Sequence, residues 1–235
     1  MKRIGFFLKI FENEKYMNDF LDGKIYMNRI SYFRGIEGDQ EDNRADSKEA
    51  LCALWQTNDV VVEVNGRKIT DFAAPIESVQ HHSKYLHLFC LFAGAISESN
   101  FLNPHANISD IQNDLSVPEK CAVLGEHYVV IHNAQKFIDR MVETVKKKGY
   151  GNNAQAGMVE YYDFETFTGE FGNRSAFFKR DQFLHQKEYR FVIDTETEGT
   201  EPLVLDIGDI RDIASVSDTW NVKVNIQTQQ SEKIV

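Results

Sequence analysis

Gln186 and Glu188 are the residues of this chain whose types and spacing could most directly do chemistry. Side chains separated by one residue on a β-strand point to the same side, so this amide and this carboxylate would face a common ligand. Tyr189, Phe191 and Ile193 lie on the opposite side from Glu188 and Arg190, which is the pattern of a strand with one face in a core. The polar face is therefore either the wall of a site or a solvated surface on which Glu188 pairs with Arg190.

A second group of candidate residues lies near the N-terminus, along or just beyond the first two predicted strands. Its members carry polar side-chain ends that could contact a ligand: Lys9, Tyr26, Ser31, Tyr32 and Arg34. Tyr and Lys commonly bury an apolar stem and leave the polar end in water. A structural role is therefore the simpler interpretation for most of them.

An acidic loop follows this unit and offers oxygen atoms to a divalent cation. Its carboxylates belong to Asp39, Glu41, Asp42 and Asp46. The segment lacks the glycine and the final bidentate glutamate at the spacing of an EF-hand loop. We expect a solvated loop here and no bound metal.

The histidines and cysteines do not predict a metal site either. His81 and His82 are adjacent, so their side chains diverge on any regular element. Cys52, Cys90 and Cys121 are odd in number and widely spaced. This usage is typical of buried thiols in a reducing cytosol, and we expect neither a disulfide framework nor a cofactor on them.

The elements that position the candidate residues open with a predicted β-α-β unit. The sequence predicts a strand over 3–11, a helix over 12–23 that ends at Gly23, and a second strand or extended segment over 24–33. Lys9 then lies on the first strand.

Further along, the sequence predicts a hairpin, a long helix and several strands. Asn65-Gly66, within the valine-rich run 60–69, suits a tight type I′ turn. A helix is predicted over 133–149, with Asn133 as its cap and Gly149 as its end. Additional strands are predicted over 84–95, 127–132, 156–164, 187–194 and 201–210.

Many strands with few helices predict an α+β fold, with a single domain over 1–235 and a mixed or antiparallel central sheet. We expect Tyr189, Phe191 and Ile193 to be buried on a central strand, and Glu188 to open into a cleft. The replacement Glu188→Gln is accordingly expected to leave folding nearly unchanged.

The composition limits the classes of partner. The chain has 235 residues, of which 42% are hydrophobic and 26% charged, enough for one compact domain with a core. A formal net charge of −10 and a pI near 5.2 argue against a broad basic surface for nucleic acid, and are compatible with a basic protein partner. The charged residue Lys9 interrupts the N-terminal apolar run before it reaches the length of a signal peptide. No later apolar run is long enough to span a membrane. We expect a cytoplasmic protein without membrane association.

The triplet that begins at Gln186 and enters a late strand resembles the Gln/Glu-x-Glu signature of the mono-ADP-ribosyltransferases. The compact α+β fold of that family also opens with a strand, a helix and a strand that carries Ser or Tyr. Its last Glu binds the nicotinamide-ribose 2′-hydroxyl and stabilises oxocarbenium-like charge as nicotinamide leaves; Glu188 matches it. The residue two positions earlier orients or activates the acceptor, and Gln186 matches it. Two departures are Ser31-Tyr32 in place of a Ser-Thr-Ser run and Lys9 in place of Arg or His.

A second resemblance extends over more of the chain. The order of segments from "GKIYMNRISYF" to "FFKRDQFLHQKEYRFVI" is similar to a widespread group of uncharacterised bacterial and phage proteins, some of them linked to abortive infection. In that group an Asp-x-x-Glu follows the second strand; Asp46 and Glu49 match it, with Arg44 just before. The late Lys, Glu and Arg of the group match Lys179, Glu188 and Arg190. The usual Asn-Asp-Pro opening is absent, because Ala45 and Ser47 flank the aspartate.

Both resemblances include Glu188, and together they imply an NAD-dependent ADP-ribosyltransferase-like protein of phage–bacterium conflict. NAD would be the substrate, and a protein or nucleic acid would accept the ADP-ribose. Glu188 would hold the ribose, Gln186 would face the acceptor, and Lys9 and Arg34 would contact phosphates. Further contacts with NAD, including the border of the nicotinamide pocket, are expected from Tyr26, Ser31, Tyr32, Arg44, Asp46, Glu49 and Arg190.

Two other functions remain compatible with the sequence. An acidic inhibitor or antitoxin-like protein would occupy a basic partner without turnover, which the net charge favours. A nuclease would place Asp46, Glu49 and Glu188 around a divalent ion, because Mg²⁺ prefers carboxylate ligands. Nicotinamide release, a stable protein complex, and metal-dependent cleavage of nucleic acid would distinguish the three.

Overall fold

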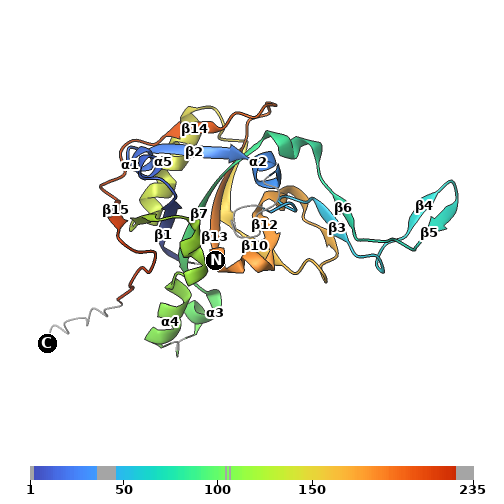
Figure 1. Ribbon diagram of the computed structural model, residues 1–235, viewed down its shortest axis with the longest axis horizontal. Helices are drawn as coiled ribbons and strands as arrows, with labels where there is room; N and C mark the ends of the chain where they lie inside the picture. The colour runs from blue at the N-terminus through green and yellow to red at the C-terminus, as the bar shows by residue number, and fades with distance from the viewer. Residues whose placement is uncertain (1–2, 36–45, 104, 106, 226–235) are drawn as a thin grey trace.

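The centre of the fold is β7 (Leu86–Ile96), a strand of eleven residues (Figure 1). The computed structural model describes residues 3–35, 46–103, 105 and 107–225. Along one edge, β7 pairs antiparallel with β13 (Glu188–Asp194), from Glu188 opposite Phe92 to Asp194 opposite Leu86. Nearly every residue of β7 is buried, as expected for a strand covered on both faces.

The other edge of β7 is shared by two strands that diverge from it. β1 (Arg3–Phe11) pairs with residues 92–96, and β2 (Lys24–Arg29) pairs with residues 87–88. The sheet therefore divides at the middle of β7. Beyond these strands it continues, always antiparallel, through β8 (His127–Ile131), β15 (Ala214–Ser217), β14 (Leu203–Asp206) and, next to β13, β9 (Ala154–Met158).

Two helices cover one face of this sheet. α1 (Glu14–Leu21) and α5 (Ala134–Lys147) contribute buried side chains to the largest core cluster, which also contains Phe7 and Phe191. Asn133 caps the start of α5, because its side chain accepts a hydrogen bond from the Lys136 amide, and Gly149 follows the end of the helix with φ 84°. The predicted cap and end of this helix are confirmed.

The opposite face is covered by α2 (Ile30–Gly35), by residues 46–52 and by the 3₁₀ helix η3 (Gly172–Phe177). Here Ile30 and Phe177 pack around Val192 of β13 in a second core cluster. Because α2 begins at Ile30, the second strand ends at Arg29 and is shorter than the predicted extended segment.

Smaller elements surround this layer. The short strands are β3 (Ala53–Trp55), β6 (Ile76–Ser78) and β11 (Gly169–Glu170), which form one antiparallel sheet, and β10 (Glu160–Tyr162) with β12 (Phe178–Arg180), which run parallel. The short helices are α3 (Glu98–Leu102), α4 (Ile108–Leu115), η1 (His81–Tyr85), η2 (Glu119–Leu124) and η4 (Asp181–Gln186).

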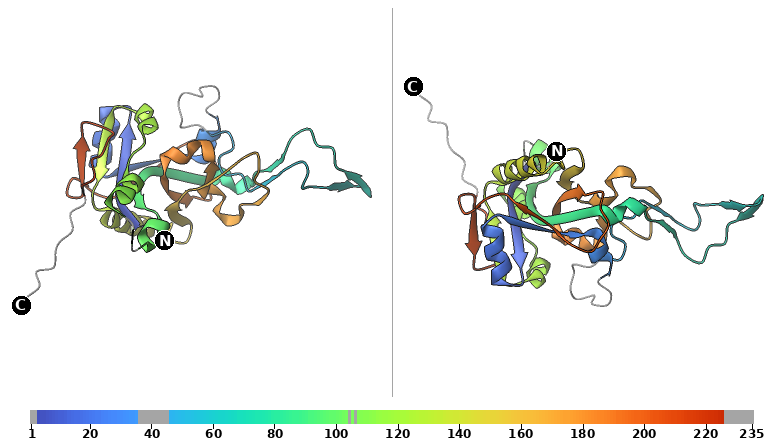
Figure 2. Two further views of the ribbon diagram at one scale, coloured as in Figure 1. Left: turned by 90° about the horizontal axis from the view of Figure 1, so that it is seen from below. Right: turned by 90° about the horizontal axis from the view of Figure 1, so that it is seen from above.

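A hairpin of β4 (Val62–Val64) and β5 (Arg67–Ile69) projects away from the rest of the molecule (Figures 1 and 2). Asn65 and Gly66 both have positive φ, 52° and 78°, as a type I′ turn requires. This confirms the predicted hairpin.

The α+β class with mostly antiparallel sheets is confirmed. Within the described ranges, no helix has both the length and the apolar character that a membrane crossing requires.

Candidate active site

β13 has one face in each core, as its alternating sequence predicts. Tyr189, Phe191 and Ile193 lie in the large core with α1 and α5. Glu188 and Arg190 point to the opposite side, but their exposed fractions are only 6% and 1%. The polar face is therefore neither solvated surface nor, as the sequence had led us to expect, the wall of an open cleft.

The carboxylate of Glu188 is held by two cations. Its Oε1 accepts a hydrogen bond from Lys179 Nζ at 2.5 Å, and its Oε2 accepts one from Arg190 Nε at 2.8 Å. Lys179 Nζ also donates to Gln186 Oε1 at 2.7 Å, so Gln186 and Glu188 share one ammonium group. Burial would raise the pKa of Glu188, but the charges of Arg190 and Lys179 outweigh it and hold the pKa well below its usual value. Glu188 is therefore ionised at neutral pH.

Arg190 joins Glu188 to a carboxylate from a distant part of the chain. Its NH1 and NH2 nitrogens donate to the two oxygens of Glu49 at 2.5 and 3.2 Å. NH1 also donates to the Ala176 carbonyl at 2.6 Å. Burial disfavours the charge of Arg190, but Glu188 and Glu49 reverse that effect and raise its pKa well above the usual value.

Asp46 extends the arrangement. The amide of Glu49 donates to the Asp46 carbonyl at 2.9 Å, and Asp46 Oδ1 pairs with the guanidinium of Arg180 at 2.7 Å. The side chain of Asp46 is fully buried, and its Oδ2 has no hydrogen-bond partner among the described residues. The buried ion network consists of Asp46, Glu49, Lys179, Arg180, Gln186, Glu188 and Arg190.

The network balances its own charge. Three carboxylates, from Asp46, Glu49 and Glu188, meet three cations, one lysine and two arginines. An unpaired ion at this depth would cost several kcal/mol, so each charge depends on the others for its burial. Such pairs rarely add net stability compared with apolar packing, which makes a role in specificity or chemistry worth testing.

Backbone geometry fixes the start of β13. Lys187 adopts a left-handed conformation, with φ 38° and ψ 50°, between η4 and β13. Its carbonyl accepts from the Ala93 amide at 3.0 Å, and the next amide, that of Glu188, donates to Tyr161 Oη at 2.9 Å. This turn places Gln186 and Glu188 on either side of the Lys179 ammonium.

Lys9 lies where β1 and β2 separate. Its Nζ donates to the Cys90 carbonyl at 2.8 Å, at a position of β7 between the residues that pair with β1 and those that pair with β2. Cys90 lies opposite Arg190 in the antiparallel pair of β7 and β13. Lys9 therefore joins β1 to β7 at the point where the sheet divides.

The remaining N-terminal candidates do not join the network. Tyr26 and Tyr32 are exposed at 56% and 54%, and Ser31 is exposed. Arg34 supports the network from outside, because its guanidinium donates to the carbonyls of Glu49 at 2.6 Å and Ala50 at 2.9 Å. The predicted contact residue Arg44 and the acidic loop residues Asp39, Glu41 and Asp42 lie outside the described residues.

Arg180 and Tyr161 are members of this site that the sequence patterns did not single out. Arg180 directly follows Lys179 in a segment otherwise rich in phenylalanine, and two adjacent cations in such surroundings were a usable signal. No pattern in the sequence pointed to Tyr161, because a tyrosine in a predicted strand is common in any core.

The cysteines are free thiols. Burial raises the pKa of Cys90 to about 12 and that of Cys121 to about 11. Both thiols are therefore protonated at neutral pH and are poor nucleophiles.

The described residues contain no group of three or more His, Cys, Asp or Glu side chains arranged to hold a metal ion. The carboxylates proposed for a nuclease site, those of Asp46, Glu49 and Glu188, each have a basic side chain as partner instead.

One pocket borders the network. It has a volume of about 280 Å³, and its lining includes Asn153, Gln155, Asn173, Ala176 and Val192. Ala176, whose carbonyl accepts from Arg190, is one of the lining residues. Besides these amide and apolar side chains, the lining carries the carboxylates of Asp194 and Glu196.

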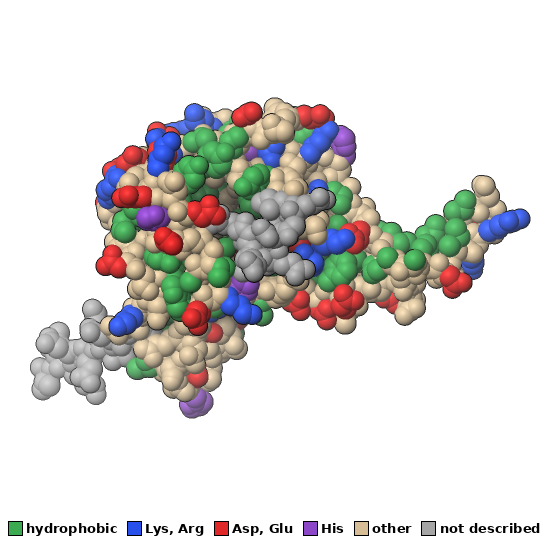
Figure 3. Space-filling model, viewed as in Figure 1, with side chains coloured by type: hydrophobic (Ala, Val, Ile, Leu, Met, Phe, Trp, Pro, Cys, Tyr) green, Lys and Arg blue, Asp and Glu red, His purple; other side chains and the backbone are tan. Residues whose placement is uncertain are grey.

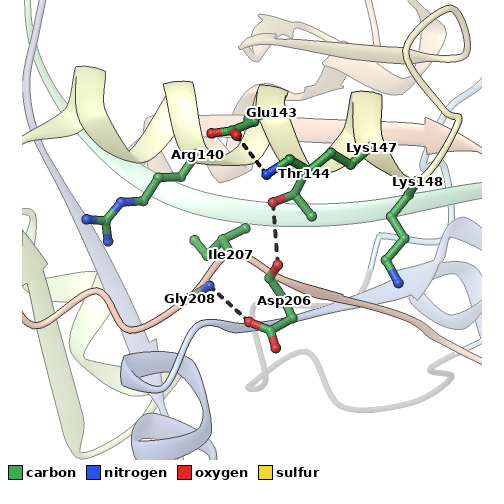
Figure 4. A pocket seen from close by; sticks show the side chains of 8 residues that line it. All are labelled: Arg140, Glu143, Thr144, Lys147, Lys148, Asp206, Ile207 and Gly208. Carbon is green, nitrogen blue, oxygen red and sulfur yellow. Dashed lines mark hydrogen bonds and ion pairs between the residues drawn. The ribbon is translucent and has the colours of Figure 1, made fainter.

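A second pocket, of about 320 Å³, lies between α5 and the end of β14 (Figure 4). Two of its cations are paired: Lys147 with Glu143 at 2.7 Å, and Arg140 with Asp212, which lies outside the lining, at 2.7 Å. It shares no residue with the network, and we assign it no chemistry.

Comparison of the chain with models of protein families, with curated proteins and with solved structures found no match.

Proposed function

We propose that this protein is an NAD-dependent ADP-ribosyltransferase acting in phage–bacterium conflict, with Glu188 as its catalytic carboxylate. The observation that carries the proposal is a carboxylate fixed by two cations, kept ionised by a lowered pKa, and coupled through Lys179 to the amide of Gln186. The resemblance of this triplet to the transferase signature supplies the substrate class.

The chemistry suits the environment of Glu188. As the glycosidic bond of NAD breaks, nicotinamide leaves with the bonding electrons and positive charge develops on the ribose. A negative charge that is already oriented, in a place from which water is excluded, stabilises that charge more strongly than a solvated one. Gln186 would orient the acceptor, whose oxygen or nitrogen then bonds to the anomeric carbon and releases its proton.

The pocket lined by Asn153, Gln155 and Asn173 is the entry that we assign to NAD, because it reaches the wall formed by Ala176 beside Arg190. Glu188 is 6% exposed, so NAD must displace part of the covering layer to reach it. Lys9 and Arg34 donate to main-chain carbonyls, so we do not assign them to the phosphates of NAD.

The test compares nicotinamide release from NAD by the wild type, Glu188→Gln and Glu49→Gln. Both substitutions remove one carboxylate charge from Arg190, so they perturb the network in similar ways. Loss of the catalytic carboxylate should reduce the rate by roughly 10²-fold or more. Glu49→Gln leaves the Glu188–Lys179 pair intact and should cost less than about tenfold.

The assay is run at a temperature at which both variants are shown to be folded by circular dichroism. Equal rates in the two variants, or no release of nicotinamide by the wild type with protein or nucleic-acid acceptors present, would refute the proposal. Metal-dependent cleavage of nucleic acid in the same preparations would favour the nuclease instead.

A second candidate, the non-catalytic binding protein, is favoured by one observation. The projecting hairpin exposes apolar residues, with Val61, Val64 and Ile69 exposed at 57%, 50% and 42%. A wild type that releases no nicotinamide but forms a stable complex with a basic protein would support this function.

A further inference from the structure

The projecting hairpin is the feature of the molecule that neither core nor network explains. β4 and β5 pair with each other and, among the described residues, with no other strand. The ribbon extends well beyond the body in Figures 1 and 2, and Figure 3 shows apolar side chains along it with basic ones at the tip. A two-stranded hairpin alone in water is marginally stable, so a partner surface is expected for it.

The base of the hairpin is held firmly to the body. β3 and β6, which lead into and out of it, pair with each other, and β3 also pairs with β11. Gln56 Nε2 donates to the carbonyls of Phe164 at 2.8 Å and Phe167 at 3.0 Å. The ribbon therefore leaves the body from an anchored position.

The register of the hairpin shows which of its backbone groups lack partners. Val64 and Arg67 flank the two-residue turn, so they form a hydrogen-bonded pair, and by alternation Val62 and Ile69 form the next. The amide and carbonyl of Glu63 consequently point away from β5. Those of Val61 would do the same if the strand were extended by one residue. This outer edge of β4 is open to another strand.

We propose that β4 pairs antiparallel with β4 of a second copy of this chain, about a two-fold axis at Val62. In this register Val61 of one copy forms the hydrogen-bonded pair with Glu63 of the other, and Val62 lies opposite Val62. The result is a four-stranded sheet in which Val62, Val64 and Ile69 of both copies share one face, with Arg67 at the end of that face next to the turn.

Charge selects the register in which two copies of β4 pair. Two other registers also give hydrogen-bond partners to the outward-pointing amides and carbonyls of β4. A shift toward the turn places Glu63 of one copy opposite Glu63 of the other, and a shift away from the turn places Asp59 opposite Glu63. Like charges directly opposite each other are destabilising. The register centred on Val62 avoids both contacts and places only valines opposite valines or the aliphatic stem of Glu63.

The contact is short, so the dimer should be weak. An edge of about five residues buries much less than the roughly 800 Å² per partner of a standard stable interface. We therefore expect an association that depends on protein concentration. The proposed dimer is independent of the proposed enzymatic activity.

The first test is a disulfide across the proposed axis. Residues directly opposite each other in a non-hydrogen-bonded antiparallel pair have Cα atoms about 4.5 Å apart, within the range of a disulfide. Val62→Cys should therefore form a covalent dimer under mild oxidation. Ile69→Cys, on the strand away from the axis, is the matched control and should stay monomeric, as should the wild type with its three native cysteines. Equal dimer yields from the two variants, or none from Val62→Cys, would overturn the proposal.

The second test uses proline as a blocker. Glu63→Pro removes an amide that points outward from β4, and Lys68→Pro removes the equivalent amide on β5, while neither amide belongs to the β4–β5 ladder. Analytical ultracentrifugation over a concentration series should show that Glu63→Pro weakens dimerisation by roughly tenfold or more, because two symmetric hydrogen bonds are lost. Lys68→Pro should dimerise like the wild type. A wild type that stays monomeric at every concentration would refute the inference.

Discussion

Glu188 has two cationic partners and almost no contact with solvent, so removing its charge affects more than catalysis. In Glu188→Gln, Lys179 and Arg190 would retain charges that are no longer fully compensated. We expect the free energy of unfolding to fall by about 3–5 kcal/mol, the usual result of removing one partner of a buried pair. Denaturant unfolding at neutral pH measures it. This replaces the expectation from sequence of a nearly unchanged fold, and a loss below about 1 kcal/mol would contradict it.

The pH dependence of this stabilisation follows from the lowered pKa of Glu188. A carboxyl group whose pKa is lower in the folded than in the unfolded chain stabilises the fold above its unfolded pKa. That contribution is lost as the pH falls through the folded value. The difference in unfolding free energy between wild type and Glu188→Gln should be constant from about pH 8 to 5 and shrink below about pH 4. A difference that grows toward acid pH would contradict the assignment.

At the scale of elements, two glycines with similar backbone conformations allow the cost of local backbone strain to be compared with the cost of a packing clash. Gly23 ends α1 with φ 94°, and a Cβ there would lie 2.1 Å from the Gly208 carbonyl oxygen. Gly66 in the hairpin turn has φ 78° and open space around it. Gly23→Ala must therefore move the chain between β14 and β15, whereas Gly66→Ala strains only its own turn.

We expect Gly23→Ala to lower the melting temperature of the whole protein, because a clash with backbone adds to a strain of about 1–2 kcal/mol. Gly66→Ala should instead increase hydrogen exchange in β4 and β5 and leave the melting temperature nearly unchanged. Equal shifts of melting temperature in the two variants would show that the hairpin belongs to the cooperative unit.

The same scale shows what the sequence could predict. The Asn65-Gly66 turn and the Asn133 cap are specified by residues within a few positions, and both were predicted correctly. The burial of Glu188 could not be predicted, because it depends on Glu49, which is far away in the chain, and on β12. Periodicity alone cannot distinguish a polar wall from a polar core.

At the scale of the whole molecule, the two proposals depend on separate parts of the structure. The network belongs to the layer over β13, and the hairpin joins the body through β3 and β6. No residue of the network lies in the hairpin, and among the described residues the strands of the ribbon pair only with each other. Removal of the ribbon should therefore distinguish a dimerisation arm from an element of the enzyme.

Replacing residues 60–71 by a short Gly-Ser turn keeps Gln56, β3 and β6, and so keeps the anchors of the base. The new loop is short, and its closure changes the free energy of unfolding by little, about 0.6 kcal/mol for each doubling of loop length. We expect the shortened protein to melt within a few degrees of the wild type, to release nicotinamide at the same rate, and to sediment as a monomer at every concentration. Retained dimerisation would refute pairing through β4 and leave the catalytic proposal intact. Loss of nicotinamide release in a folded, shortened protein would show that the arm takes part in the reaction, which the separation of arm and network argues against.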